Sequence, residues 1–193
     1  MRFPMNLEAW LTDIDEGASK CVSEHGTQIP FGKHCGAFGT QRRHDIHSGV
    51  DLYAPNGQSV FAMTDGVVVA VYPFTGVAAN SPWWRDTMAI CIEDDSGVWL
   101  YGEVEPNPLI KPGTVVLEGE FIGAVKQVLR IDKGRPMSML HMERYLPGTR
   151  EFVEQWLIGE PQPQNLVDPT ELLGQFDTYV EWCRWEDDQG YPT

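Results

Sequence analysis

Short stretches of apolar residues, separated by turn-forming residues, fill the middle of the chain and have the lengths and β-branched content of strands. Two of the separating segments, APNGQ at 54–58 and DDSG at 94–97, have the composition of turns, and the second predicts a hairpin. We therefore expect an all-β core over residues 28–146. Its expected strands lie near 49–53, 60–63, 66–72, 88–93, 98–104, 115–125 and 138–145.

The two ends of the chain have different patterns. Near the N-terminus the apolar spacing becomes i, i+3, i+4, i+7, which predicts an amphipathic helix on Leu7, Trp10, Leu11 and Ile14. Toward the C-terminus the sequence is rich in Pro, Gln and Glu, and Asp168-Pro169 predicts the start of a short helix. We divide the chain into an N-terminal helical extension at 1–27, the β core at 28–146, and an irregular to helical C-terminal extension at 147–193 that packs on the core.

The excess of acidic over basic residues limits the kinds of molecule that the protein can bind. The chain has 193 residues, with 14 basic against 28 acidic side chains and a net charge of −14. This charge would repel nucleic-acid phosphates, and the sequence contains no basic run or basic helix. We therefore exclude nucleic acid as a partner.

The spacing of the cysteines and the N-terminal sequence indicate the cellular compartment of the protein. Cys21, Cys35, Cys91 and Cys183 are widely scattered and form neither a zinc-finger pattern nor a tight disulfide framework. The first residues lack the apolar stretch of a secretory signal, and no apolar run approaches the roughly 18–20 residues of a membrane helix. We expect a cytoplasmic protein without a membrane span, with export by another route left open.

One predicted strand, MSMLHMERY at 137–145, contains a histidine in an apolar setting. With a period of two residues, Leu140 and Met142 point to one face, whereas Met139, His141 and Glu143 point to the other. Apolar residues on both faces predict a strand buried on both sides, where an imidazole needs a partner. His141 is either a core histidine hydrogen-bonded to the backbone or a ligand.

The stretch HSGVDLYAP offers two further metal ligands. On an extended chain His47, Gly49 and Asp51 face the same way, and the glycine leaves room for an imidazole and a carboxylate to converge on one ion. Zinc accepts both ligand types, and His141 is the natural third ligand. The alternative is a structural hydrogen bond between His47 and Asp51 that closes a loop, because H-x-x-x-D alone is a weak pattern.

Several segments together resemble one family. PFGKHCGAFGTQRRHDIHSGVDLYAPNGQSVFAMTDGVVVAV, VWLYGEV, IKPGTVVLEGEFIGAV, LHMERY and VDPTELL resemble, in order, the lysostaphin-type (LytM-like) zinc endopeptidases. The likeness covers about 28–146, with an echo at 167–173. It implies an antiparallel β-sheet, barrel-sandwich scaffold with short flanking helices and a groove across the sheet. It also implies Zn²⁺ as cofactor, peptidoglycan-like peptide as substrate, and His47, Asp51 and His141 as the zinc ligands.

Two positions depart from the family pattern. The family carries Y-x-H-L and H-L-H-F-E, and its histidines outside the ligand set are thought to activate water and stabilise the oxyanion. Those two positions are Glu103 and Met139 in this chain. A carboxylate can act as a base, so Glu103 is a candidate for that role, with a solvated strand carboxylate as the alternative. A thioether can neither accept a proton nor donate a hydrogen bond, so we expect Met139 to impair activity.

Two functions follow from the likeness, with a third as a weaker alternative. The first is a zinc-dependent peptide hydrolase, and the second is a catalytically silent zinc scaffold that binds a peptide or a protein in the groove. The GVVVAV and IKPGTVVLEGEFIGAV segments also resemble lipoyl-type domains, but neither Lys111 nor Lys126 has the setting of a modifiable lysine. The residues that we expect to line the groove are Met139, His34, His44 and Tyr101.

Overall fold

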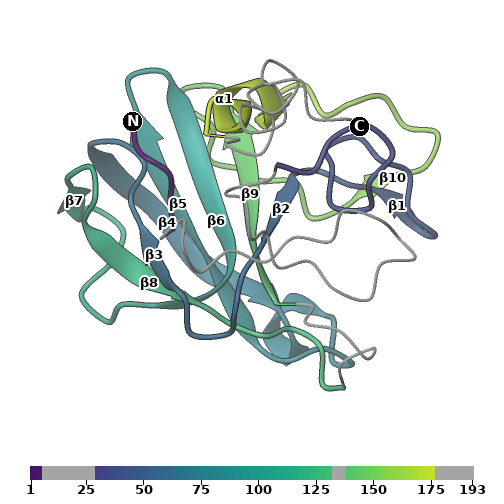
Figure 1. Cartoon of the computed structure of the whole chain (residues 1–193), viewed down its shortest axis with the longest axis horizontal. Helices are drawn as coiled ribbons and strands as arrows, with labels where there is room; N and C mark the ends of the chain where they lie inside the picture. Colours follow the sequence, from purple (N-terminus) through teal and green to yellow (C-terminus); the bar gives the residue numbers. More distant parts are fainter. Residues whose placement is uncertain (6–28, 132–137, 177–193) are drawn as a thin grey trace, which may run out of the picture.

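The computed structural model describes residues 1–5, 29–131 and 138–176. The helix expected on residues 7–14 lies outside these residues, as do Cys21 and Cys183. Within the described residues the fold is almost entirely antiparallel β, which confirms the predicted fold class (Figure 1).

A nine-stranded antiparallel sheet forms the body of the protein. Its main path runs in the order β11-β9-β6-β5-β4-β7, with β2 paired to β9, and β8 paired to both β3 and β6. A separate pair, β1 with β10, lies beside this sheet (Figure 1). The bounds of the strands are β1 Asp45–Ile46, β2 Val50–Tyr53, β3 Ser59–Phe61, β4 Gly66–Thr75, β5 Thr87–Asp94, β6 Gly97–Pro106, β7 Val115–Val116, β8 Phe121–Val125, β9 Met139–Tyr145, β10 Trp156–Leu157 and β11 Leu166–Val167.

Two long hairpins give the sheet its central strands. Asp94 pairs with Gly97, so β5 and β6 form the hairpin that the DDSG turn predicts. Between β4 and β5 the chain makes a longer excursion that contains a short 3₁₀ helix, η2 (Val77–Ala79). Of these strands, β6 also pairs with β9, which carries part of the candidate site.

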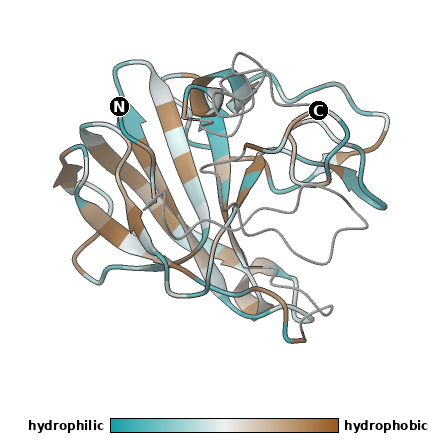
Figure 2. Cartoon of the chain, in the orientation of Figure 1, coloured by the Kyte–Doolittle hydropathy of each residue, from teal (hydrophilic) through white to brown (hydrophobic). Residues whose placement is uncertain are grey.

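The sheet separates two hydrophobic clusters. One face carries the main core, which includes Leu52, Trp99, Tyr101 and Leu140, while the other carries a smaller cluster around Leu100 and Tyr145. The alternation along the strands produces this division, and Figure 2 shows hydrophobic and hydrophilic positions alternating along the central strands. The candidate site lies on the face that carries the smaller cluster.

Residues outside 28–146 contribute to the core. Phe3 and Met5 are buried in the main cluster, and the Arg2 backbone N–H donates to the Met63 carbonyl at 2.8 Å. At the other end β11 extends the sheet beside β9, and the helix α1 (Thr170–Gly174) buries Leu173. This helix follows Asp168-Pro169, as the sequence predicts. Among the described residues, no helix has the length and apolar character to cross a bilayer.

Candidate metal centre

The register of three strands builds the candidate metal centre. On β9, His141 lies directly opposite Asp51 of β2, and on its other side it lies opposite Gly102 of β6. His47 precedes β2 by three residues and packs its ring against that of His141, with 5.0 Å between the ring centroids. His47, Asp51 and His141 are all buried.

Gly49 makes this convergence possible. A Cβ atom at this position would lie 2.4 Å from the Met142 carbonyl oxygen and 2.8 Å from the His141 ring. Any side chain there would therefore displace the β9 backbone or the imidazole. The glycine between His47 and Asp51 thus has the steric role that its spacing predicts.

Three donor atoms face one another at the centre of the cluster. His47 Nε2 lies 3.1 Å from both His141 Nδ1 and Asp51 Oδ1, and His141 Nδ1 lies 2.9 Å from Asp51 Oδ1. They form a group of three residues whose donor atoms lie close enough to hold a metal ion.

The far nitrogen of each imidazole has its own partner. His47 Nδ1 lies 3.0 Å from the Ala37 carbonyl oxygen, and His141 Nε2 lies 3.0 Å from Glu143 Oε1. Both partners are acceptors, so each ring donates one N–H outward, and its other nitrogen faces Asp51. Second-sphere acceptors of this kind fix the tautomer of metal-binding histidines.

Glu143 is itself held on both oxygens. Ser48 Oγ donates to Glu143 Oε1 at 2.5 Å, and the Tyr145 hydroxyl donates to Glu143 Oε2. The Tyr145 oxygen in turn accepts the Val153 backbone N–H at 3.0 Å. This chain of hydrogen bonds connects the orientation of His141 to the segment that follows β9.

Arg42 neutralises the outer oxygen of Asp51. Its guanidinium donates to Asp51 Oδ2 at 2.5 Å and also donates to the Cys35 carbonyl oxygen, at 2.8 Å from one nitrogen and 3.0 Å from another. Burial alone would raise the pKa of Asp51, but the charges of His47 and Arg42 and its hydrogen bonds hold the pKa well below its usual value. Asp51 is therefore an anion at neutral pH.

The two histidines differ in protonation. Burial lowers the pKa of His47 despite the nearby carboxylate. Burial would lower the pKa of His141 as well, but its hydrogen bonds to Asp51 and Glu143 outweigh this effect and raise the pKa to about 10. In the metal-free protein His141 is therefore protonated at neutral pH. Its proton supplies positive charge between the donor atoms, where a bound cation would supply it instead.

Glu103 lies at a break in the regular geometry of β6. Gly102 and Glu103 together oppose Ala89 of β5, which makes a β-bulge, and Glu103 has a left-handed φ of 61°. Beyond this point β6 leaves β9 and pairs with β8. The bulge therefore places Glu103 where the sheet changes partners.

The Glu103 carboxylate belongs to the electrostatic environment of the metal centre. Its buried Oε2 has no hydrogen-bond partner among the described residues. Burial, together with the charge of Asp51, raises the pKa of Glu103 to about 8, although His141 and Arg42 oppose the shift. A desolvated carboxylate that has one oxygen without a hydrogen bond can take up and release a proton near neutral pH.

The residues expected to line the groove have different positions. Met139 is half-buried on the same face of β9 as His141, and His34 lies beside Tyr53, accepting the Gly36 N–H on Nδ1 at 2.9 Å. His44 is exposed on the loop before β1. Tyr101 does not line a groove beside the metal centre, contrary to the prediction. It is fully buried in the main core on the opposite face, where its hydroxyl accepts the Met63 N–H at 2.9 Å.

Sequence reasoning missed two members of the site. Arg42 comes from a glycine-rich loop without any periodicity that could assign its direction. Tyr145 follows Glu143 by two residues on β9, so strand alternation places the two side chains on one face, but their hydrogen bond has no sequence signature.

Comparison with known proteins identifies the family of the chain. The model of peptidase family M23 matches residues 45–150, which is more than half of the chain. Among curated proteins none matches the sequence.

Two solved structures illustrate the fold. The structure of LytU is 18% identical, covers 81% of this chain and 91% of its own, and has a TM-score of 0.52. The antimicrobial peptidase lysostaphin from Staphylococcus simulans is 19% identical over 79% of this chain, with a TM-score of 0.50. This chain spans about half of the lysostaphin structure, 51% of its length. At these identities the structures establish a common fold, and the family-model match establishes that the chain belongs to peptidase family M23.

Proposed function

We propose that this chain is a zinc-dependent peptide hydrolase of the peptidoglycan-degrading type, with one zinc ion held by His47, Asp51 and His141. One observation carries the proposal: one nitrogen of each imidazole and one carboxylate oxygen lie close together, and an outward hydrogen bond fixes each ring. Metal binding displaces the proton from His141 Nδ1, after which all three atoms can donate a lone pair to one cation.

The donor set suits zinc in type, number and spacing. Donors around a tetrahedral zinc ion lie about 3.4 Å apart, given metal–ligand bonds of about 2.1 Å. The three atoms here are 2.9–3.1 Å apart, so a movement of a few tenths of an ångström is enough to accommodate the ion. Bound zinc would supply a Lewis acid and a water of lowered pKa, and three protein ligands leave a coordination position for that water.

Glu103 is the side chain that we assign to proton transfer. Its unpartnered oxygen and its raised pKa suit a group that takes a proton from water and returns it to the leaving amine. Its carboxylate is not part of the close donor group of His47, Asp51 and His141. We therefore place Glu103 beside the ligands and not among them.

Met139 favours a second candidate function, a zinc scaffold that binds a peptide or protein partner without cleaving it. On β9 it lies two residues before His141 and on the same face, so it is the side chain best placed to assist a second proton transfer. A thioether cannot do so, and the loss of one acid–base group lowers rates typically about 10²–10⁴-fold. We expect turnover to be slow.

Turnover assays separate the two functions. The full chain is incubated with crosslinked peptidoglycan and with a glycine-rich peptide, with and without added zinc, in parallel with Glu103→Gln and Glu103→Ala. The hydrolase predicts zinc-dependent cleavage that both variants reduce by at least about 10²-fold. Zinc binding without cleavage of either substrate by the wild type would support the scaffold and contradict the hydrolase.

A further inference from the structure

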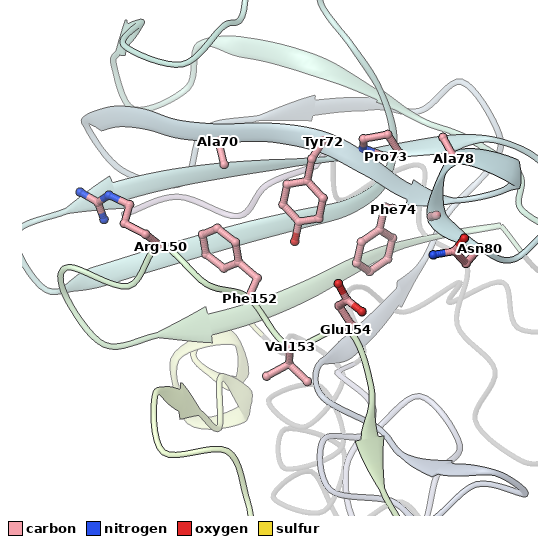
Figure 3. A pocket seen from close by; sticks show the side chains of 11 residues that line it. Ala70, Tyr72, Pro73, Phe74, Ala78, Asn80, Arg150, Phe152, Val153 and Glu154 are labelled. Atoms are coloured by element: carbon pink, nitrogen blue, oxygen red, sulfur yellow. The ribbon is translucent and has the colours of Figure 1, made fainter.

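A pocket of about 400 Å³ opens on the same face of the sheet as the metal centre. Figure 3 shows that Tyr72 and Phe74 extend into it from β4, while Phe152 and Glu154 approach from the segment that follows β9. The Tyr72 and Phe152 rings are stacked, with centroids 5.8 Å apart and 15° between their planes. The pocket thus has aromatic walls and one carboxylate.

The pocket adjoins the metal centre through Phe74. This ring lines the pocket and also packs on the metal-ligand candidate His141, with 5.3 Å between the centroids. The hydrogen bond from the Val153 N–H to Tyr145, which holds Glu143, connects the opposite wall to the same histidine. A peptide lying across the metal centre could therefore place a neighbouring side chain in the pocket.

The charges at the pocket are unequal. The Glu154 side chain points toward the aromatic rings in Figure 3, and among the described residues no hydrogen bond or ion pair involves its carboxylate. Arg150 also lines the pocket, but its guanidinium donates to Glu93 Oε2 at 2.6 Å and lies at the far end, away from Phe74. The carboxylate that remains uncompensated gives the pocket a negative character, in a chain of net charge −14.

We infer that this pocket binds the ammonium group of a substrate residue beside the bond to be cleaved, with Glu154 as the counter-ion and Tyr72, Phe74 and Phe152 as the aromatic walls. A cation gains both from a carboxylate and from aromatic faces, whereas an anion gains from neither. The occupant is thus a lysine-like side chain or a free amino terminus of a peptide. The inference rests on the proposed function, because the pocket is a substrate subsite only if cleavage takes place next to it.

Binding of two matched peptides tests the inference. The probes are acetyl-Gly-Gly-Lys-Gly-Gly-amide and the same peptide with Nε-acetyllysine, which keeps the length of the side chain and removes its charge. Calorimetric titration into the full chain, first zinc-free and then zinc-loaded, gives the affinity ratio of the two peptides. We expect the lysine peptide to bind about fivefold or more tightly, as one partly exposed ion pair with a cation–π contribution predicts.

Two variants assign the preference to the pocket. Glu154→Gln removes the carboxylate and should bring the two affinities within about twofold of each other. Glu151→Gln makes the same change in charge on an exposed residue outside the pocket, and it should keep the full preference. Equal binding of both peptides to the wild type, or an undiminished preference in Glu154→Gln, would overturn the inference.

The same titrations, combined with the turnover assay on glycine-rich peptide, separate this inference from the proposed function. A lysine preference that depends on Glu154 in a chain that takes up no zinc would support ammonium binding by the pocket and refute the zinc hydrolase, and with it the role of the pocket as a substrate subsite. Zinc uptake with cleavage of glycine-rich peptide, but without a lysine preference, would refute the pocket assignment alone.

Discussion

Asp51 and His141 lie directly opposite each other on β2 and β9, and Asp51 Oδ1 lies 2.9 Å from His141 Nδ1. Ninety residues of sequence separate them, so the pairing of two antiparallel strands creates the contact. A further hydrogen bond holds each side chain in place: Arg42 donates to Asp51 Oδ2, and His141 Nε2 donates to Glu143 Oε1. Preorganisation of this kind limits the conformational entropy lost when a ligand binds.

Gly49→Ala should damage the centre without removing a donor. The new methyl group would lie within 2.8 Å of the His141 ring and closer still to the Met142 carbonyl oxygen. We expect a loss of about 1–3 kcal/mol in the free energy of unfolding, and zinc affinity weakened by at least about tenfold because the imidazole is displaced. Urea denaturation and a competitive zinc titration measure the two effects.

Gly174→Ala is the control for this change. A Cβ atom there would meet nothing within 4 Å, so its stability should stay within about 0.5 kcal/mol of the wild type and its zinc affinity should not change. Equal behaviour of Gly49→Ala and Gly174→Ala would contradict the steric role of Gly49.

Glu143→Gln tests the orientation of His141. The substitution keeps the shape of the side chain but removes the anion that accepts the His141 Nε2–H and the hydrogen bonds of Ser48 and Tyr145. Outer-sphere changes of this kind weaken metal binding typically about 10–100-fold, which a zinc competition assay would detect. Glu160→Gln, an exposed carboxylate far along the chain, should bind zinc like the wild type. A wild-type affinity in Glu143→Gln would show that His141 needs no such support.

Glu103 predicts a pH dependence in the metal-free protein. Its pKa is about 8 in the folded state against an ordinary value of 4.5, so the folded state holds a proton that the unfolded state loses between these values. The free energy of unfolding should therefore fall as the pH rises from about 4.5 to about 8, by up to about 1.4 kcal/mol per pH unit from this group.

Glu103→Gln should remove that contribution, so its advantage over the wild type should grow from pH 5 to pH 8. Denaturant titrations of both metal-free proteins across this range give the comparison. Parallel curves would mean that the Glu103 carboxylate is solvated in the folded state, which was the structural alternative for this residue.

Met139→His should raise turnover. The half-buried Met139 shares the site face of β9 with His141, and an imidazole there could donate and accept protons where a thioether cannot. We expect an increase of about 10²-fold or more in kcat, measured on a glycine-rich peptide with zinc present. Met139→Leu controls for packing and should leave the rate unchanged. A zinc-loaded Met139→His protein without any gain would indicate that the groove is not arranged for hydrolysis.

The sequence predicts the parts of this site that depend on regular strands. Alternation along 137–145 places Met139, His141 and Glu143 on one face, and the glycine between His47 and Asp51 indicates the gap that their convergence needs. These features follow from a period of two residues and from side-chain size, which are local properties.

Irregular backbone accounts for what the sequence does not predict. In a regular strand Tyr101 and Glu103 would share a face, but the left-handed bulge at Glu103 breaks the alternation. Tyr101 lies in the core, whereas the Glu103 carboxylate interacts electrostatically with Asp51 and His141. A positive φ is uncommon for glutamate, so the residue at position 103 gives no sequence signal for a bulge. Arg42 likewise reaches Asp51 from a loop whose path depends on tertiary contacts.

Zinc content per chain tests the central claim most directly. The chain of 193 residues is loaded with excess zinc, dialysed against metal-free buffer and measured by mass spectrometry for metal and protein, with His141→Ala and the exposed-histidine variant His44→Ala in parallel. The account predicts one zinc per chain in the wild type and in His44→Ala, and far less than one in His141→Ala. A wild type that retains no zinc, or a His141→Ala protein that retains a full equivalent, would contradict it.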